Sequence, residues 1–200
     1  MKLLSKIPKN VYLACSGGKD SMMALHFLLQ GRRDVHVLYY NHGTKHGKEA
    51  EHFVHEFCRE NKLHLDIGTY YGGTNTEAAW RDARYKFFSF YKDKPIITCH
   101  HLNDNIETWL MSSIKGQSKF IPYSRNNVIR PFLLATKKDI DLYVTRNNIE
   151  WIEDPSNIEN EYSRNKLRNQ VVPVLRDINP GLETTFYYKC LSKYEKDGII

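Results

Sequence analysis

Six consecutive residues near the start of the chain carry groups that proteins use to bind phosphate. Residues 16–21 read Ser-Gly-Gly-Lys-Asp-Ser. The two glycines let backbone N–H groups approach phosphate oxygens closely, and the serine hydroxyls add further donors. Lys19 adds a positive charge, and Asp20 adds a carboxylate that can hold Mg²⁺ against a pyrophosphate or pull on the loop. An ordinary glycine turn would need neither the serines nor the aspartate, so the string predicts a phosphate-binding loop.

A second group of polar residues has spacing that suits acid–base chemistry. His100 precedes Asp104 by four residues, and Glu107 follows Asp104 by three. On a helix that starts near Leu102, the two acids share one face. That face can position Mg²⁺, nucleotide phosphates or an attacking amine, so these residues are predicted to be catalytic. The His100-His101 pair before an acidic helix is also typical of helix capping, which stays the alternative.

Basic residues gather in two further places. Arg81 and Arg84 lie three apart on a predicted helix and would form one cationic edge suited to phosphate. The segment 162–168 combines basic side chains with a tyrosine, which suits an RNA backbone and a stacked base. A solvated helix face is the alternative for both places. The predicted RNA-binding residues are Tyr162, Arg164, Asn165, Lys166 and Arg168.

Short apolar runs alternate with helical patterns along the chain. The predicted strands are residues 11–15, 35–40, 63–67 and 95–99, and helical spacing follows each of them. This order predicts an α/β fold: a doubly wound parallel sheet with helices on both faces, followed by a short helical C-terminal segment. Ligands bind such sheets at the carboxyl ends of the strands, where the candidate residues fall. The predicted nucleotide-binding residues are Ser16, Gly17, Gly18, Lys19, Asp20, Ser21, Asn41 and His42.

Two predicted helices follow the second and third strands. The first covers about residues 48–61, and the second begins near Asn75. Helical spacing places several side chains on one face of each helix. The predicted faces are His52, Phe53, Phe57 and Cys58 in the first helix, and Ala78, Ala79, Arg81 and Tyr85 in the second.

Later segments predict two more helices. Thr136 is expected to cap a helix that carries Asp139 in its first turn and reaches about Asn147. A basic helix is expected over residues 165–178, packed onto the sheet by an apolar group. That group is Val171, Val172, Val174 and Leu175. The expected division is a nucleotide-binding catalytic domain over residues 1–150 and a helical segment over residues 151–200 that packs on it and contacts RNA.

Composition limits the class of protein. The 200 residues are 41% hydrophobic, enough for one α/β core, and the formal charge of +6 favours a polyanionic partner. The four cysteines form no Cys-x-x-Cys pair, which predicts small core residues in a reducing cytoplasm. No run approaches the roughly 18 apolar residues of a membrane span, and no secretory leader is expected. A homodimer stays open.

The phosphate loop and three other blocks together resemble one enzyme family. The loop fits neither the Walker pattern nor the dinucleotide fingerprint, but it resembles the PP-loop of the ATP-pyrophosphatases. The other blocks are Asn75 to Tyr85, Thr98 to Thr108, and Asp154-Pro155-Ser156-Asn157 followed by Tyr162 to Arg168. Over residues 10–180 the chain resembles the tRNA(Ile)-lysidine synthetase family, and the last block is the most specific to it.

The resemblance implies an activity, cofactors and site residues. It implies that ATP, with Mg²⁺, adenylates the C2 carbonyl oxygen of the wobble cytidine in tRNA(Ile) with a CAU anticodon. Free L-lysine then displaces AMP, with Asp104 or His100 as the general base. Asp20 and Asp104 are the expected metal ligands. The expected catalytic residues are Asp20, Arg81, Arg84, His100, Asp104 and Glu107.

Three positions depart from the family pattern. Asn41 and Asn103 stand where the family usually has Asp, and Lys19 stands where many members carry an uncharged residue. Members also carry further tRNA-recognising domains after the catalytic one, whereas this chain stops at Ile200. Two alternatives therefore stay open: a PP-loop tRNA thiolation enzyme, which the cysteine spacing disfavours, and a non-catalytic nucleotide or tRNA binder.

Overall fold

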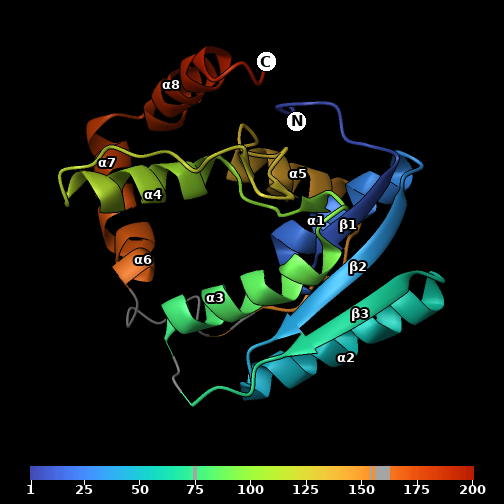
Figure 1. Cartoon of the computed structure of the whole chain (residues 1–200). Coiled ribbons are helices and arrows are strands. Elements are labelled where there is room, and N and C mark those ends of the chain that lie inside the picture. Colours follow the sequence, from blue (N-terminus) through green and yellow to red (C-terminus); the bar gives the residue numbers. More distant parts are fainter. Residues whose placement is uncertain (74–75, 154, 156–162) are drawn as a thin grey trace.

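A six-stranded sheet organises the computed structural model, which describes residues 1–73, 76–153, 155 and 163–200. The strand order is β3-β2-β1-β4-β6-β5, parallel except for the last pair (Figure 1). The prediction of an α/β parallel sheet is confirmed, but the short β5 and β6 were not predicted. The strands are β1 Asn10–Ala14, β2 Asp34–Asn41, β3 His64–Thr69, β4 Ile96–Ile97, β5 Ser124–Arg125 and β6 Val128–Ile129.

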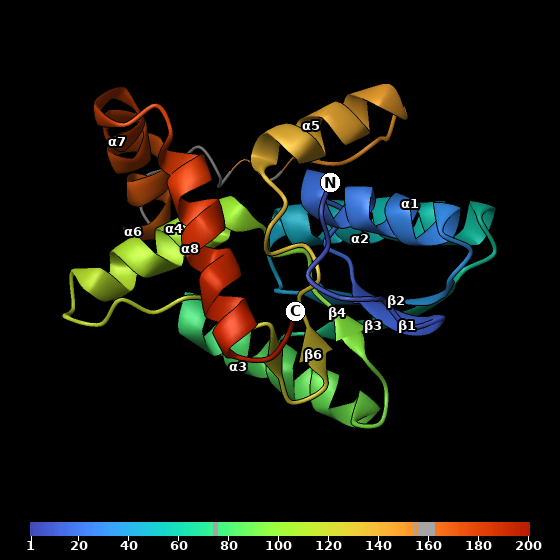
Figure 2. The same cartoon turned by 90° about the horizontal axis from the view of Figure 1, so that it is seen from above.

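Helices cover both faces of this sheet. Figure 2 shows α1, α2 and α5 on one face and α3 on the other. The first layer is α1 Lys19–Gln30, α2 Lys45–Glu60 and α5 Lys137–Arg146; the second is α3 Glu77–Phe88 with the short 3-10 helix η1 Ser89–Tyr91. The remaining helical segments are α4 Leu102–Ser113, α6 Ser163–Lys166, the π-helical turn η3 Leu167–Val171, α7 Val172–Ile178 and α8 Leu182–Lys196.

The centre of the sheet is buried on both sides because its central strands carry apolar residues on both faces. Val11, Leu13 and Val37 are at most 2% exposed and pack with α1, α2 and α5. On the opposite face, Leu38 packs with Phe88 of α3 and with β4 and β6. Buried aliphatic side chains of this kind each contribute about 1.5–3 kcal/mol, so the central strands are well fixed. The strand ends that carry the candidate site therefore have a rigid support.

The C-terminal helices do not pack as predicted. Val172 joins a separate core with α4 and α8, whereas Val171 and Val174 are 39% and 54% exposed. The prediction that this segment packs onto the sheet is therefore wrong, since its apolar contacts go to α4. The helix predicted over residues 165–178 is present, because α6, the π-helical turn η3 and α7 follow one another without a break, whereas α8 was not predicted as a separate helix. The division at residue 150 stays a prediction.

Local predictions for α2 and α5 have different outcomes. Thr136 caps α5 as predicted: its Oγ1 accepts the Asp139 N–H at 3.1 Å, and the Asp139 carboxylate accepts the Thr136 N–H at 2.9 Å. In α2, however, the four residues predicted to share one face differ in exposure: His52 is exposed, Phe53 and Phe57 are half-buried, and Cys58 is buried. The buried residues of α2 are Gly47, Ala50, Val54 and Cys58.

The four thiols are free in this structure. Cys15, Cys58 and Cys190 are buried in the two apolar cores, and Cys99 is half-buried. Burial raises the pKa of each thiol, which keeps all four in the protonated form at neutral pH. Among the described residues, no helix is both long enough and apolar enough to cross a membrane.

Candidate active site at the strand ends

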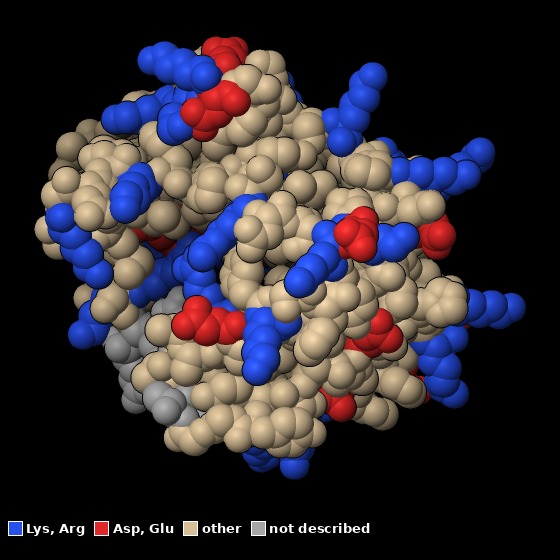
Figure 3. Space-filling view, viewed as in Figure 1, with Lys and Arg blue, Asp and Glu red and all other residues tan. Residues whose placement is uncertain are grey.

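A cleft of about 960 Å³ opens where β1, β2 and β4 end. Its lining extends from the loop before α1 to α4, α6 and η3. Figure 3 shows a hollow on this face that contains Lys and Arg side chains. The cleft brings together most of the predicted site residues, namely Ser16, Gly18, Lys19, Asp20, Ser21, His42, Arg84, His100, Asp104, Glu107, Arg164, Asn165 and Arg168. The volume is at the upper end of the range typical of small-molecule sites.

The loop between β1 and α1 is shaped by hydrogen bonds among its own residues. Ser21 Oγ donates to the Gly18 carbonyl at 2.8 Å and accepts the Ser16 N–H at 3.1 Å. Gly17 has φ +79°, a conformation that favours glycine. The loop leads directly into the N-terminus of α1, whose dipole and N–H groups favour an anion. The loop therefore has the glycine turn and the adjoining helix N-terminus that the predicted phosphate site needs, and phosphate binding stays a prediction.

Two neighbouring segments fix this loop. The Ile152 N–H donates to the Gly17 carbonyl at 2.9 Å. A Cβ on Gly17 would lie 3.1 Å from a side-chain carbon of Ile152 and 3.2 Å from one of Val54 in α2. Lys19 turns toward Asp141 of α5, with Nζ 3.1 Å from the carboxylate, and lies 4.9 Å from the Trp151 ring centroid. The Lys19 ammonium group therefore forms an ion pair with α5, while the residue also lines the cleft.

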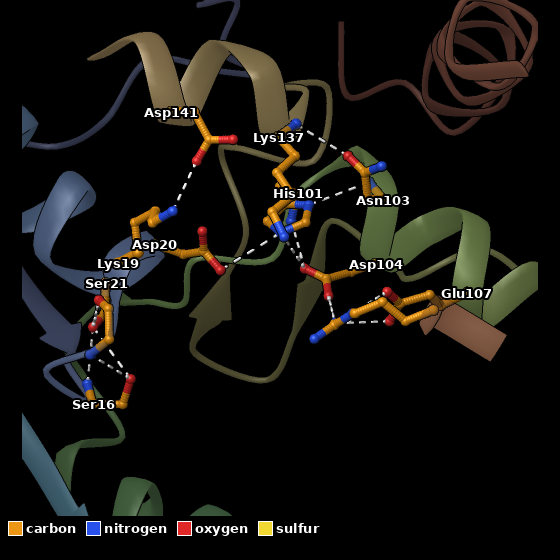
Figure 4. A network of polar contacts seen from close by, with 12 residues as sticks. Ser16, Lys19, Asp20, Ser21, His101, Asn103, Asp104, Glu107, Lys137 and Asp141 are labelled. Carbon is orange, nitrogen blue, oxygen red and sulfur yellow. Dashed lines mark hydrogen bonds and ion pairs between the residues drawn. The ribbon is translucent and has the colours of Figure 1, made fainter. Parts of the chain in front are cut away.

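His101 connects the loop to α4 and was not among the predicted catalytic residues. Its Nε2 lies 3.6 Å from Asp20 and 3.7 Å from Asp104 (Figure 4). It also caps α4, because its Nδ1 accepts the Asn103 N–H and Asp104 accepts the His101 N–H at 2.9 Å. The three-residue spacing of a capping box, from His101 to Asp104, is the sequence signal that could have found it. The capping alternative is therefore correct for His101, while Asp104 still faces the cleft.

The pKa values of the two histidines shift in opposite directions. Burial lowers the pKa of His100 to about 3, with Arg130, Arg164 and Arg84 adding to the effect, so His100 is neutral at pH 7. Its Nδ1 lies 3.0 Å from Thr98 Oγ1. Burial also opposes charge on His101, but the carboxylates of Asp104 and Asp20 outweigh it and raise its pKa.

Asp104 and Glu107 bind two arginines of the C-terminal segment. Glu107 is 2% exposed and accepts hydrogen bonds from Arg164 Nε at 2.7 Å and Arg168 Nε at 2.6 Å. Arg164 also donates to Asp104 at 3.3 Å. Burial opposes ionisation of Asp104, but His101 and Arg164 lower its pKa below the usual range. Asp104 is therefore a carboxylate at neutral pH, and both Glu107 oxygens accept from guanidinium groups.

Several predicted residues lie away from the cleft lining. Arg84 lines the cleft, but Arg81 is exposed and lies against the Tyr85 ring, so the two arginines do not form one edge there. Lys166 is exposed. Tyr162, and with it Asn75, Asp154, Ser156 and Asn157 of the family-like blocks, lie outside the described residues.

The two asparagines serve as local anchors. Asn103 Oδ1 accepts the Lys137 N–H at 3.0 Å, which joins the starts of α4 and α5. Asn41 is 4% exposed and uses its amide on Gly43 and Glu51 rather than toward the cleft. The expectation that Asn41 contacts the nucleotide directly therefore has no support in this geometry.

The carboxylates of Asp20 and Asp104 are compatible with one magnesium ion that takes most of its ligands from substrate phosphates. Mg²⁺ commonly takes one or two protein carboxylates together with substrate phosphates. Asp20 fits, because its side chain is 44% exposed beside the phosphate loop. Asp104 fits less well, since its oxygens already accept from the His101 backbone and Arg164. No group of three potential metal-ligating side chains occurs within the described part of the chain.

The sequence matches known proteins over most of its length. The tRNA(Ile)-lysidine synthase of Haemophilus ducreyi is 35% identical over 179 residues, which are 83% of this chain and 42% of that protein. The enzyme of Petrotoga mobilis is 31% identical, covering 93% of this chain and 66% of that protein. The enzyme of Bacillus subtilis is 32% identical, covering 88% and 42%. The chain thus spans 42 to 66% of the length of these relatives.

A family model supports the same relationship, and it covers the phosphate loop, α4 and the arginines of α6 and η3. The model of the PP-loop domain matches residues 2–175. The resemblance that the four sequence blocks indicated is confirmed. The chain belongs to the PP-loop domain family, and its sequence is similar to those of tRNA(Ile)-lysidine synthases.

Proposed function

We propose that this chain catalyses lysidine formation on tRNA(Ile) with a CAU anticodon. ATP adenylates the C2 carbonyl oxygen of the wobble cytidine, and the ε-amine of free L-lysine then displaces AMP. The observation that carries the proposal is one cleft in which His101 joins Asp20 of the phosphate loop to Asp104 of α4. Similarity to curated tRNA(Ile)-lysidine synthases supports the choice of substrate, and a tRNA substrate implies work in the cytoplasm.

The loop side of the cleft would carry the adenylation step. A carbonyl oxygen is a poor leaving group, and transfer of AMP to it makes displacement by an amine feasible. The backbone N–H groups of residues 16–21 and the N-terminus of α1 would hold the ATP phosphates. Asp20 would hold Mg²⁺, which when bound neutralises charge on the departing pyrophosphate. Arg84 of α3, which also lines the cleft, would add a cation near the reacting phosphate.

The α4 side would carry the attack by lysine. Lysine binds as an ammonium ion and must lose a proton before it attacks. The ionised Asp104 would attract the ammonium group, and the neutral His100 would accept a hydrogen bond from it; because the low pKa of His100 makes it too weak a base to hold the proton, the proton would pass to solvent. Glu107 would hold Arg164 and Arg168 and so keep Asp104 in place.

A direct assay tests the proposal. Purified protein with ATP, Mg²⁺, labelled lysine and tRNA(Ile) bearing CAU should retain label on the RNA and release AMP in equal amount. The Asp20→Ala variant should lose both products, whereas Lys94→Ala, an exposed change before β4, should keep them. Tight tRNA binding without AMP under every combination of substrates would instead favour the non-catalytic binder.

One observation bears on the thiolation alternative. Cys15 and Cys99 follow adjacent parallel strands and both line the cleft, although no cysteine pair is close in sequence. Burial raises the pKa of both thiols, and a thiol is a weak nucleophile. The variants Cys15→Ser and Cys99→Ser should therefore retain lysine transfer, with any loss following stability. A thiolation enzyme would lose turnover at one of them and would place sulfur in tRNA nucleosides.

A further inference from the structure

One wall of the cleft, residues 42–50, is made by the segment that joins β2 to α2 and by the first two turns of α2. His42, Thr44, His46, Gly47 and Ala50 of this segment line the cleft. The wall stands beside the phosphate loop, because β1 and β2 are paired in parallel and Gly17 packs against Val54 of α2. Any shift at the start of α2 therefore moves a surface that a nucleotide bound at the loop would touch.

The side chains of Asn41 and Glu51 do not line the cleft, but they form hydrogen bonds that support this wall. Asn41 Oδ1 accepts the Gly43 N–H at 2.8 Å, and Asn41 Nδ2 donates to Glu51 Oε2 at 2.7 Å. The Gly43 turn has φ +79°, and its geometry is fixed by the first of these bonds. The second bond ties the end of β2 to the second turn of α2. One buried amide thus joins strand, turn and helix.

The start of α2 is fitted closely around the same amide. A Cβ on Gly47 would lie 2.6 Å from Asn41 Oδ1, closer than any side chain allows. Gly47 N–H donates to the Thr44 cap at 2.9 Å, and its carbonyl accepts from Tyr39 at 2.6 Å. The segment therefore has little freedom to relax when the amide is replaced.

We propose that Asn41 and Glu51 form a latch that positions the cleft wall 42–50 for nucleotide binding. Asn41 accepts a backbone N–H through its oxygen and donates to the Glu51 carboxylate through its nitrogen, a combination that an ionised aspartate cannot provide. A carboxylate at position 41 would meet the Glu51 carboxylate at hydrogen-bond distance, and two like charges that close must separate or share a proton. Both are positioning residues; that nucleotide binding is the property affected rests on the proposed function.

Charge-exchange variants test the latch. Asn41→Asp should weaken ATP binding, measured by calorimetry, by about tenfold, because a close like-charge pair displaces the wall. The control Glu51→Gln keeps an acceptor for the Asn41 amide and should bind ATP within about twofold of the parent protein. The double variant Asn41→Asp with Glu51→Gln restores a donor and an acceptor, so it should recover most of the affinity. KM for lysine at saturating ATP should stay constant throughout.

A second measurement needs no nucleotide and separates the latch from the proposed function. Amide hydrogen exchange of residues 42–50 should speed up in Asn41→Asp and return toward the parent rate in the double variant. If Asn41→Asp does not fold, Glu51→Ala, which removes the acceptor alone, should show the same faster exchange. Unchanged exchange in these variants, or a double variant no better than Asn41→Asp, would overturn the latch. Normal ATP binding and latch behaviour without lysine transfer would overturn only the proposed function.

Discussion

At the scale of single residues, the two adjacent glycines of the phosphate loop meet different constraints. Gly17 has φ +79° and contacts Ile152 and Val54 at its Cα face. Gly18 has φ −74°, and a Cβ there would meet only Ser16 Oγ, at 3.4 Å. Gly17 is therefore required by the fold. At Gly18 the fold would tolerate a side chain, so the glycine there keeps the cleft open beside the loop.

This difference gives a paired prediction. Gly17→Ala should lower the free energy of unfolding by about 1–2 kcal/mol because of its left-handed backbone. Gly18→Val should keep stability near that of the parent protein and abolish AMP formation, since the side chain blocks backbone approach to phosphate. Urea unfolding and AMP release measure the two effects. A Gly18→Val variant with normal AMP release would show that the loop does not bind ATP phosphates.

The buried Glu107 gives a second residue-level prediction. Its carboxylate is 3% exposed, while the guanidinium side chains of Arg164 and Arg168 are 27% and 35% exposed. Glu107→Gln should cost about 1–3 kcal/mol, less than a fully buried pair because water reaches the arginines. The control is Glu183→Gln, which weakens the more exposed pair with Arg176 and should cost at most about 1 kcal/mol. Equal losses in both would contradict a buried anchor.

At the scale of elements, α8 supports the helix that carries Asp104. Asn105 of α4 donates to Tyr194 Oη at 2.9 Å, and its Oδ1 accepts the Ile121 N–H at 2.9 Å. Tyr194 in turn donates to the Ile121 carbonyl at 2.8 Å and is 1% exposed. Helices α4 and α8 are thus joined through a closed set of buried hydrogen bonds as well as apolar contacts.

Removal of one hydroxyl tests this support. Tyr194→Phe keeps the ring and leaves the Ile121 carbonyl without the Tyr194 hydroxyl, so it should lower stability by about 1–3 kcal/mol. Because α4 stays packed by its apolar face, lysine transfer at 25 °C should fall less than stability does. Thermal unfolding and transfer rates should be compared with Tyr188→Phe, an exposed tyrosine of α8. A normal melting temperature for Tyr194→Phe would show that the network contributes nothing.

Elements whose pattern lies in neighbouring residues could be predicted from the sequence, whereas contacts between distant residues could not. Strands 11–15 and 35–40 and the Thr136 cap depend on residues close in sequence, and the structure has them. Two-residue strands such as β5 carry no periodic pattern. The α8 core residues are four apart, a signal that was present but not used; they are Leu182, Phe186, Cys190 and Tyr194. The contact of Arg164 with Glu107 spans 57 residues, so no local pattern could reveal it.

At the scale of the whole molecule, the buried thiols make stability sensitive to alkali. Burial raises the pKa of Cys58 and Cys190 to about 12 each from an ordinary value of 9.0. Between these values the unfolded chain loses the thiol protons and the folded chain keeps them. Folded protein then binds more protons, so stability falls as pH rises above about 9, by about 1.4 kcal/mol per pH unit for each thiol.

A double variant measures this slope. With Cys58→Ala and Cys190→Ala combined, the free energy of unfolding should fall about 2 kcal/mol per pH unit less steeply between pH 9.5 and 10.5. The control Val54→Ala also removes buried atoms of α2 but no titrating group, so it should lower stability and leave the slope unchanged. The same slope in the double variant as in the parent would show that these thiols ionise equally in both states.

The charged residues in and around the cleft predict which substitutions weaken tRNA binding and which lower the rate of lysine transfer. Arg164 and Arg168 bind carboxylates, whereas Lys166, between them on α6, is exposed. Lys166→Ala should weaken binding of tRNAs with CAU and UAU anticodons equally and flatten the log–log salt slope by about 0.7–0.9 if it contacts one phosphate. At saturating tRNA its lysine transfer should stay normal and specific for CAU, because the cytidine itself must enter the cleft.

Arg164→Ala should instead lower transfer even at saturating tRNA, since Asp104 and Glu107 lose a partner. Lys94→Ala, an exposed change at the opposite end of the sheet, is the control. An unchanged salt slope for Lys166→Ala, together with normal turnover for Arg164→Ala, would mean that the RNA approaches the cleft from another side.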